Sequence, residues 1–137
     1  MLDNDTRPVR RSALICNELH RYNIDIAALQ ETRIEGQGQV REETHTVFWY
    51  GKAGVRREAG VAFAISNRLL PKLPSLPKGL SERLMSLRVP LAKKNFLILI
   101  CVYAPTMTYS EQDKETFYEE LCRVVDTVPT SDKLLIY

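Results

Sequence analysis

The chain has 137 residues, which is enough for one compact domain with a substantial core. Its hydrophobic (45%), aromatic (8%) and charged (26%) fractions are ordinary for a globular protein and exclude the disordered and fibrous classes. The formal charge of +2 is too small to argue for or against a nucleic acid partner. Function must therefore be sought in particular residues.

Cysteine usage and hydropathy predict the compartment. The chain has an odd number of cysteines, Cys16, Cys101 and Cys122, and no Cys-x-x-Cys pair, which argues against structural zinc. All three lie in apolar segments, as reduced core residues do. Residues 1–11 carry several charges and no apolar core, so they do not form a secretory signal. The longest apolar run, residues 96–103, is too short to cross a bilayer. We expect an intracellular protein, nuclear or cytoplasmic, that is neither secreted nor in a membrane.

The chain opens with a predicted amphipathic helix. Ile15, Leu19 and Tyr22 recur at spacings of four and three, and Pro8 stands where a helix begins, which predicts a helix over residues 7–22. The short apolar run at residues 24–29 then predicts a buried strand.

Further short apolar runs predict strands along the rest of the chain. They cover residues 47–50, 59–66, 83–89 and 134–137, with polar, basic or proline-rich connections at 35–44, 52–58 and 71–79. Residues 96–102 are continuously apolar and partly β-branched, as expected of a central strand covered on both faces.

A second helix is predicted over residues 110–126. Ser110 and Asp113 form a capping box, and three apolar residues follow on one helical face: Phe117, Leu121 and Val124. Helices mixed with buried strands, without a repeat or a shift in composition, predict a single α/β (α+β) layered domain over residues 1–137.

Polar residues follow two of the predicted strands directly. Residues 24–29 run into Gln30-Glu31-Thr32-Arg33, and the strand at 96–102 runs into Tyr103-Ala104-Pro105-Thr106. A carboxylate at a strand end suits magnesium, a hard ion that keeps several waters and takes one or two protein carboxylates. A lone glutamate is more often a solvated surface residue, but the pairing of the two junctions favours a ligand.

These junctions, with Ala59-Gly-Val-Ala-Phe between them and the helix at Ser110 after them, resemble the endonuclease/exonuclease/phosphatase superfamily in motif and in order. The resemblance is closest to its retrotransposon branch, the RTE-type elements and the host proteins related to them. It implies a sandwich of two packed sheets with helices outside, and hydrolysis of phosphodiester or phosphate monoester bonds with a divalent metal.

The resemblance assigns roles to four residues. Glu31 matches the glutamate that binds Mg²⁺ or Mn²⁺, and Tyr103 matches a tyrosine whose hydroxyl lies near the scissile phosphate; a core or rim aromatic is the alternative for Tyr103. Arg33 orients Glu31, meets a phosphate, or forms a surface ion pair with Glu35 or Glu31. Many relatives have an asparagine at the position of Thr106. A contact of Thr106 with the phosphate therefore involves a residue type that departs from the family pattern.

Some family features have no counterpart in the chain. These are a first strand carrying an asparagine, and the Gly-Asp-Phe-Asn and Ser-Asp-His segments that supply the general base region. We therefore expect a partial domain, mainly one sheet with flanking helices, whose exposed apolar sheet face promotes self-association.

The expected function is that of a fragment of a magnesium-dependent DNA endonuclease domain of retrotransposon type, inactive alone, with DNA as the partner of the full-length domain. Two alternatives stay open: a non-catalytic binding or interaction module, and a member of the phosphatase branch acting on a soluble phosphorylated molecule. The pairs at residues 56–57 and 93–94 are either solvated turn charges or contacts to the DNA backbone.

Overall fold

The computed structural model describes residues 3–30, 32, 36–51, 60–81, 83–104 and 109–136. The helices and strands, in chain order, are α1 (Asp3–Arg21), β1 (Ile26–Gln30), β2 (Gln37–Arg41), β3 (His45–Tyr50), β4 (Val61–Ser66), η1 (Leu70–Lys72), β5 (Lys78–Ser81), β6 (Leu84–Pro90), η2 (Ala92–Lys94), β7 (Phe96–Val102), α2 (Glu111–Asp126) and β8 (Lys133–Ile136).

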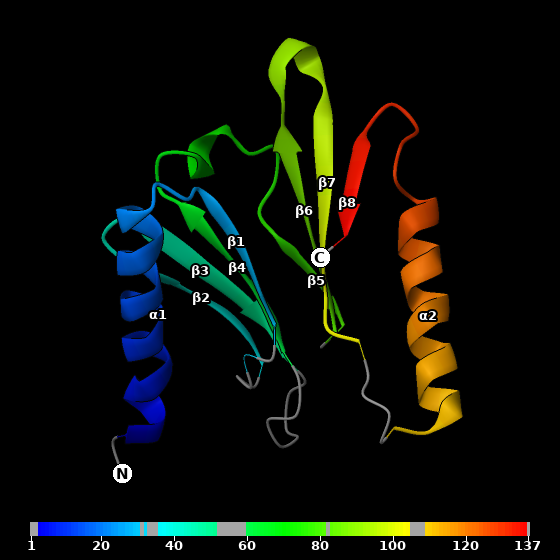
Figure 1. Cartoon of the computed structure of the whole chain (residues 1–137), viewed down its shortest axis with the longest axis horizontal. Helices are drawn as coiled ribbons and strands as arrows, with labels where there is room; N and C mark the ends of the chain where they lie inside the picture. The colour runs from blue at the N-terminus through cyan, green and yellow to red at the C-terminus, as the bar shows by residue number, and fades with distance from the viewer. Residues whose placement is uncertain are drawn as a thin grey trace.

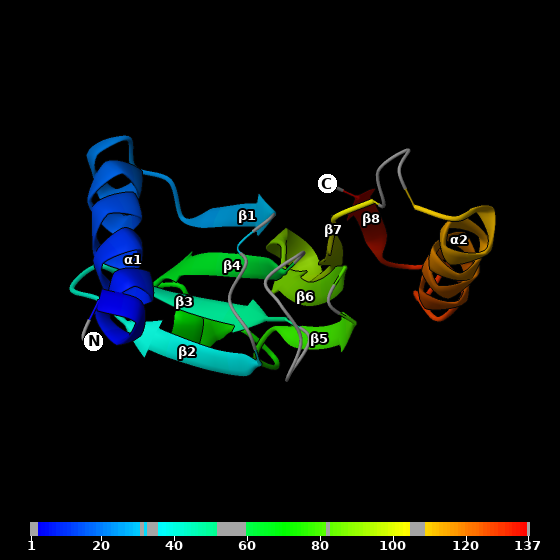
Figure 2. The ribbon, with the colours of Figure 1, turned by 90° about the horizontal axis from the view of Figure 1, so that it is seen from below.

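The elements form four layers, helix–sheet–sheet–helix (Figure 1). The first sheet has the strand order β1-β4-β3-β2 and the second has the order β5-β6-β7-β8. All pairs are antiparallel except β7 with β8, which are parallel and joined through α2. Helix α1 covers the outer side of the first sheet and α2 the outer side of the second, as the view from below also shows (Figure 2).

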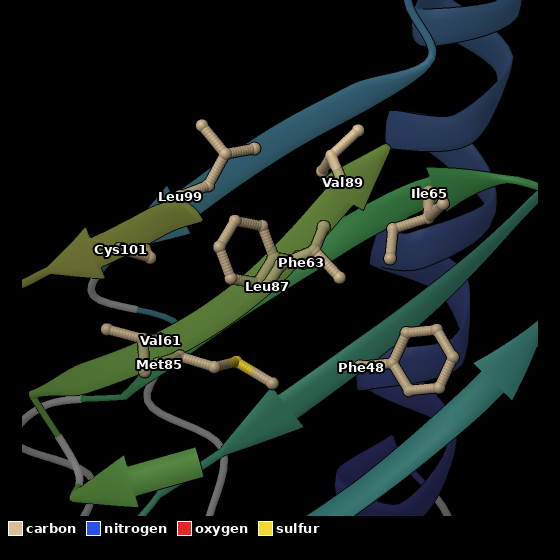
Figure 3. Packing of buried hydrophobic residues seen from close by; sticks show 9 residues of the cluster. All are labelled: Phe48, Val61, Phe63, Ile65, Met85, Leu87, Val89, Leu99 and Cys101. Atoms are coloured by element: carbon tan, nitrogen blue, oxygen red, sulfur yellow. The ribbon is translucent and has the colours of Figure 1, made fainter. Parts of the chain in front are cut away.

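The main core lies between the two sheets (Figure 3). Strand residues alternate between faces, so every second side chain of β3, β4, β6 and β7 points inward. The inward residues bury apolar side chains from both sheets: Phe48, Val61, Phe63, Ile65, Met85, Leu87, Val89, Leu99 and Cys101. This interlocking layer fixes how the two sheets face each other.

Two smaller cores attach the helices. Cys16 and Leu19 of α1 pack on the outward residues of the first sheet: Val47, Ala62 and Ala64. Phe117 of α2 packs on Leu84 and Ile100 of the second sheet. The helical face predicted from Phe117, Leu121 and Val124 is therefore confirmed as the buried face of α2.

The expectation of mainly one sheet is wrong, because the structure has two four-stranded sheets whose inner faces cover each other. The second sheet gains β5, which begins within the proline-rich connection predicted at 71–79 and ends beyond it, and the first gains β2, which lies within the polar, glycine-containing connection predicted at 35–44. Both depend on glycine: the Trp49 ring lies where a Cβ of Gly38 would be, and the Tyr50 ring lies where a Cβ of Gly79 would be. Because an aromatic ring from another strand packs over the glycine, the residues of β2 and β5 themselves need not form an apolar run that would reveal the strand.

The first helix begins four residues before the predicted start, at Asp3 rather than residue 7. At the other end, Asn23 adopts a left-handed conformation (φ 56°), and the Ile24 N–H donates to the Leu19 carbonyl at 2.8 Å. This cap ends the helix and turns the chain into β1.

Other predictions are confirmed closely. Strand β7 has the predicted bounds and is paired on both sides, and α2 begins after Ser110, whose side chain accepts a hydrogen bond from the Asp113 N–H. Strand β1, predicted to be buried, is an edge strand with half-buried side chains. The basic loop predicted at 52–58 lies outside the described residues. Among the helices described, none has the length and apolar character needed to span a membrane.

Candidate active site

The ends of several strands meet at one edge of the sandwich, the lower edge in Figure 1. In the first sheet, Gln30 at the end of β1 pairs with Val61 at the start of β4. In the second sheet, Val102 at the end of β7 pairs with Leu84 at the start of β6. Gln30 and Val102, the last residues of β1 and β7, thus lie at the same edge of the sandwich (Figure 1).

A contact between the sheets joins the two polar junctions. The Cys101 thiol in β7 donates to the Leu29 carbonyl in β1, with 3.5 Å between sulfur and oxygen. Burial raises the pKa of Cys101 to about 11, although hydrogen bonds to the backbone of Ala62 and Leu29 oppose that effect. The thiol is thus protonated at neutral pH and able to donate. Leu29 lies two residues before Glu31, and Cys101 lies two before Tyr103, so this contact ties the two junctions together.

Tyr103 is the one predicted site residue that the structure describes. It lies directly after β7 and packs, half-buried, against the core between the sheets. Its N–H donates to the Arg83 carbonyl at 2.9 Å, and its own carbonyl accepts from Arg83 Nη1 at 3.0 Å. The pairing of β6 and β7 therefore continues one residue beyond the strands and fixes the backbone of Tyr103.

Glu31, Arg33 and Thr106 lie outside the described residues. Their described neighbours are placed: Gln30 ends β1, and the Thr32 N–H donates to the Gly60 carbonyl at 3.3 Å. The structure thus locates the chain on both sides of Glu31 at the same edge as Tyr103, and the roles of the three undescribed residues stay predictions.

Thr32 tests whether this edge suits a hydrated metal ion. Its Oγ1 atom is buried and has no hydrogen-bond partner among the residues that the structure describes. A buried hydroxyl without a partner costs free energy, so a water or another oxygen ligand beside it is favourable. With the Glu31 carboxylate next in sequence, the available donors are hard oxygens, which magnesium prefers. No group of three or more His, Cys, Asp or Glu side chains suited to a metal occurs in the described part of the chain.

The residues at the opposite edge serve other purposes. His45, for which the sequence suggests no partner, is buried; its Nε2–H donates to the Ile24 carbonyl at 2.7 Å and its Nδ1 lies 2.9 Å from Thr44 Oγ1. A carbonyl only accepts, so Nε2 carries the proton. The ring anchors the start of β1. The 3₁₀ helix η2, which includes the lysines at 93–94, connects β6 to β7 at this edge, away from Tyr103.

Sequence reasoning missed Arg83 and Tyr109. The Arg83 guanidinium carbon lies 5.4 Å from the centroid of the Tyr103 ring and 4.6 Å from that of Tyr109. The strands predicted at 83–89 and 96–102 contained a usable signal, because a hairpin between them places Arg83 opposite Tyr103. No spacing in the sequence indicates Tyr109.

A comparison of the sequence with models of protein families agrees with this two-sheet sandwich, in which β1 and β7 end at the same edge. Residues 2–136 match the Endonuclease/Exonuclease/phosphatase family, and the chain belongs to that family. Craniofacial development protein 2 from Bos taurus is 30% identical over 123 residues, and the same protein from Tragulus javanicus is also 30% identical over 123 residues. In each case the match covers 90% of this chain but only 20% and 21% of the relative, so the chain spans about a fifth of these curated relatives.

Proposed function

We propose that this chain forms part of a magnesium-dependent phosphodiesterase of retrotransposon type that acts on DNA. The observation that supports it best is the contact between Cys101 and Leu29, because it ties the junction containing Glu31 to the one containing Tyr103. Membership of a family of nucleases and phosphatases supports phosphate-ester hydrolysis in general.

Within this proposal each residue has a chemical role. Glu31 would hold Mg²⁺, or Mn²⁺, which takes the same oxygen ligands; when bound, such an ion would supply positive charge to offset the negative charge on the phosphate oxygens. The Tyr103 hydroxyl donates a hydrogen bond to a phosphate oxygen, which stabilises the charged transition state. Arg33, two residues after Glu31, and Thr106, three residues after Tyr103, would contact the phosphate.

A polypeptide of these 137 residues alone should bind the metal weakly and should not cut DNA. The Gly-Asp-Phe-Asn and Ser-Asp-His segments that the family resemblance associates with the general base do not occur in its sequence. A positioned general acid or base contributes about a hundredfold to ten-thousandfold in rate, so one carboxylate without those groups supports little hydrolysis.

A plasmid-nicking assay with Mg²⁺ and with Mn²⁺ tests this expectation. The variants are Glu31→Ala and the control Glu43→Ala, which removes an exposed carboxylate at the opposite edge. We expect supercoiled plasmid to stay intact with all three proteins. Robust nicking that Glu31→Ala abolishes and Glu43→Ala preserves would contradict the inactivity while supporting Glu31 as a ligand.

DNA as the partner, rather than a soluble phosphorylated molecule, is tested by binding across a salt series. Each phosphate neutralised by a basic side chain contributes about −0.9 to the slope of log affinity against log salt for B-DNA. We expect weak binding that falls steeply with salt. Binding that is negligible at every salt concentration would count against DNA as the partner.

A second proposed role is self-association through β8. The inner sheet faces are buried, so exposed apolar residues lie elsewhere, several of them scattered singly along the chain. Three are consecutive: Leu134, Leu135 and Ile136 of β8, the outermost described strand of the second sheet, are 37%, 44% and 44% exposed. Three consecutive apolar residues on an edge strand suit antiparallel pairing with β8 of a second copy about a two-fold axis. Sedimentation equilibrium should show a dimer that Leu135→Lys dissociates and Tyr118→Lys, on exposed α2 surface, does not; a wild-type monomer would contradict this role.

An intracellular location, nuclear or cytoplasmic, completes the proposal. All three cysteines are free, and Cys16 and Cys101 are buried in separate cores. Free thiols in these positions are typical of a reducing compartment.

A further inference from the structure

Arg83 occupies an unusual place beside Tyr103. It directly precedes β6, and the backbone hydrogen bond from Tyr103 N–H to its carbonyl holds the two residues opposite each other. Its own N–H donates to Ser81 Oγ at 3.1 Å, which fixes the turn from β5 into β6. The backbone of Arg83 is thus held from both sides.

The side chain of Arg83 makes three further contacts. Nη1 donates to the Tyr103 carbonyl, and the guanidinium lies over the rings of both Tyr103 and Tyr109. Tyr109 directly precedes Ser110, the N-cap of α2, so one cation joins the end of β7 to the start of the second helix. Each contact of a cation with a ring face is favourable, and Arg suits such stacking because its guanidinium is planar.

An ordinary ion pair does not explain this arrangement. Within the described residues, the ion pairs of arginine join Arg21, Arg68 and Arg88 to carboxylates, and none involves Arg83. In the part of the chain that the structure describes, its guanidinium instead contacts the two aromatic faces and a backbone carbonyl. Both the backbone and the ring of Tyr103 depend on the same side chain.

We propose that Arg83 is a positioning residue that fixes the Tyr103 ring, and so its hydroxyl, at the edge where β1 and β7 end. The inference rests on the proposed role of Tyr103 beside a phosphate. Arg83 acts through Tyr103, with Tyr109 as the second face that keeps the guanidinium in place.

The test uses the 137-residue chain with ¹³C-labelled tyrosine rings, observed by NMR and titrated with the dinucleotide d(TpT) in the presence of Mg²⁺. The variants are Arg83→Met, which removes the charge but keeps much of the length, Arg83→Lys, and Tyr109→Leu, which removes one ring without altering the strand pairing. Arg68→Met, in an exposed ion pair remote from Tyr103, is the control. Tyr103→Phe identifies the Tyr103 signal.

We expect Arg83→Met to shift and broaden the Tyr103 and Tyr109 ring signals while Tyr22, which directly follows α1, is unchanged. Binding of d(TpT) should weaken about fivefold, because a Tyr103 ring that has lost its cation–π contact must be ordered when the dinucleotide binds; Arg83→Lys should partly restore binding. Tyr109→Leu should also shift Tyr103, and Arg68→Met should not.

Two outcomes would overturn the proposal in different ways. A Tyr103 ring that responds to d(TpT) equally in the wild type and in Arg83→Met overturns the role of Arg83 alone. A wild-type Tyr103 ring that ignores d(TpT), with Tyr103→Phe binding as well as the wild type, overturns the role of Tyr103 in the proposed function and the role of Arg83 with it.

Discussion

At the scale of single residues, the three cysteines show how burial controls chemistry. Cys101 and Cys16 are 0% and 2% exposed, and burial raises the pKa of each to about 11; the Glu42 carboxylate adds to the effect at Cys16. Cys122 lies on the exposed side of α2. Because the thiolate is the reactive form, two effects slow the reaction of the buried thiols with reagents: burial blocks access to the sulfur, and the raised pKa keeps it protonated.

Alkylation with iodoacetamide at pH 7.5 should therefore modify Cys122 first and leave Cys16 and Cys101 intact until the protein unfolds. Mass spectrometry of peptides checks the order, with a urea-unfolded sample as the control. Rapid modification of Cys101 in the folded chain would contradict the packing between the sheets.

The same pKa shifts predict how stability changes with pH. The folded state holds the thiol protons more tightly than the unfolded state, whose thiols have pKa values near 9. Their contribution to stability is thus complete below about pH 9 and is lost as pH rises toward about 11. Urea unfolding at pH 8 and 10 should give a lower midpoint at pH 10, and Cys101→Ser should reduce that difference.

At the scale of elements, two Arg–Asp pairs have the same geometry in different surroundings. Arg88 binds Asp132 with Nε–Oδ2 at 3.1 Å and Nη2–Oδ1 at 3.3 Å, just before β8, and its guanidinium lies 3.9 Å from the centre of the Phe96 ring. The Asp132 side chain is 3% exposed and that of Arg88 39%. Arg68 binds Asp25 in the same two-bond manner, but their side chains are 75% and 44% exposed.

Arg88→Met should lower the free energy of unfolding by about 2 kcal/mol, because it leaves the Asp132 carboxylate buried without its partner; this is less than the roughly 3–5 kcal/mol for a fully buried pair, since Arg88 is partly exposed. Arg68→Met, the matched control, should cost no more than about 1 kcal/mol. Urea denaturation of both variants measures the difference. Equal costs would show that Asp132 is not held as described.

The Asp25 carboxylate has its own pH signature. The Ser66 hydroxyl beside it is the largest cause of its lowered pKa; burial acts the other way, and Arg68 lowers the pKa further. The Ser66 Oγ atom is buried and makes no hydrogen bond of normal geometry to another described group, whereas the Ser66 backbone N–H donates to the Asp25 carbonyl at 2.8 Å. The contribution of the Asp25 carboxylate to stability is therefore present above the usual aspartate pKa and lost as pH falls through the lowered one.

Sequence patterns predicted those elements whose own residues specify them. The run at residues 96–102 and the capping box at Ser110 gave the observed β7 and α2 because burial on both faces and a side-chain cap are local signals. Strands β2 and β5 escaped because their stability comes from Trp49 and Tyr50, rings supplied by another strand and packed over glycines. The expectation of an exposed inner face has a different origin: it follows from the family segments that have no counterpart in the sequence, whereas the two sheets present bury each other's inner faces.

The candidate site divides in the same way. The two motifs placed Glu31 and Tyr103 at strand ends, which the bounds of β1 and β7 support. The residues that hold Tyr103, by contrast, come from register and tertiary packing: Arg83 from the β6–β7 hairpin and Tyr109 from the approach to α2. Neither relation is visible without knowing which strands pair.

At the scale of the whole molecule, the two packed sheets place distant segments at one edge. The sheets interlock through the core around Phe63 and Leu87, and the Cys101–Leu29 contact fixes their offset at the edge where β1 and β7 end. The proposed site at this edge would need both sheets, because Gln30 ends β1 in the first sheet and Tyr103 directly follows β7 in the second.

The most direct test of the account is where a divalent ion binds. Mn²⁺ broadens nearby NMR signals even when it binds weakly, so a titration of the ¹⁵N-labelled chain locates it. We predict selective broadening of the amides of Thr32 and Tyr103, abolished by Glu31→Gln. Broadening centred instead on Asn67, beside Asp25 at the opposite edge, or unchanged by Glu31→Gln, would contradict a metal site at the ends of β1 and β7.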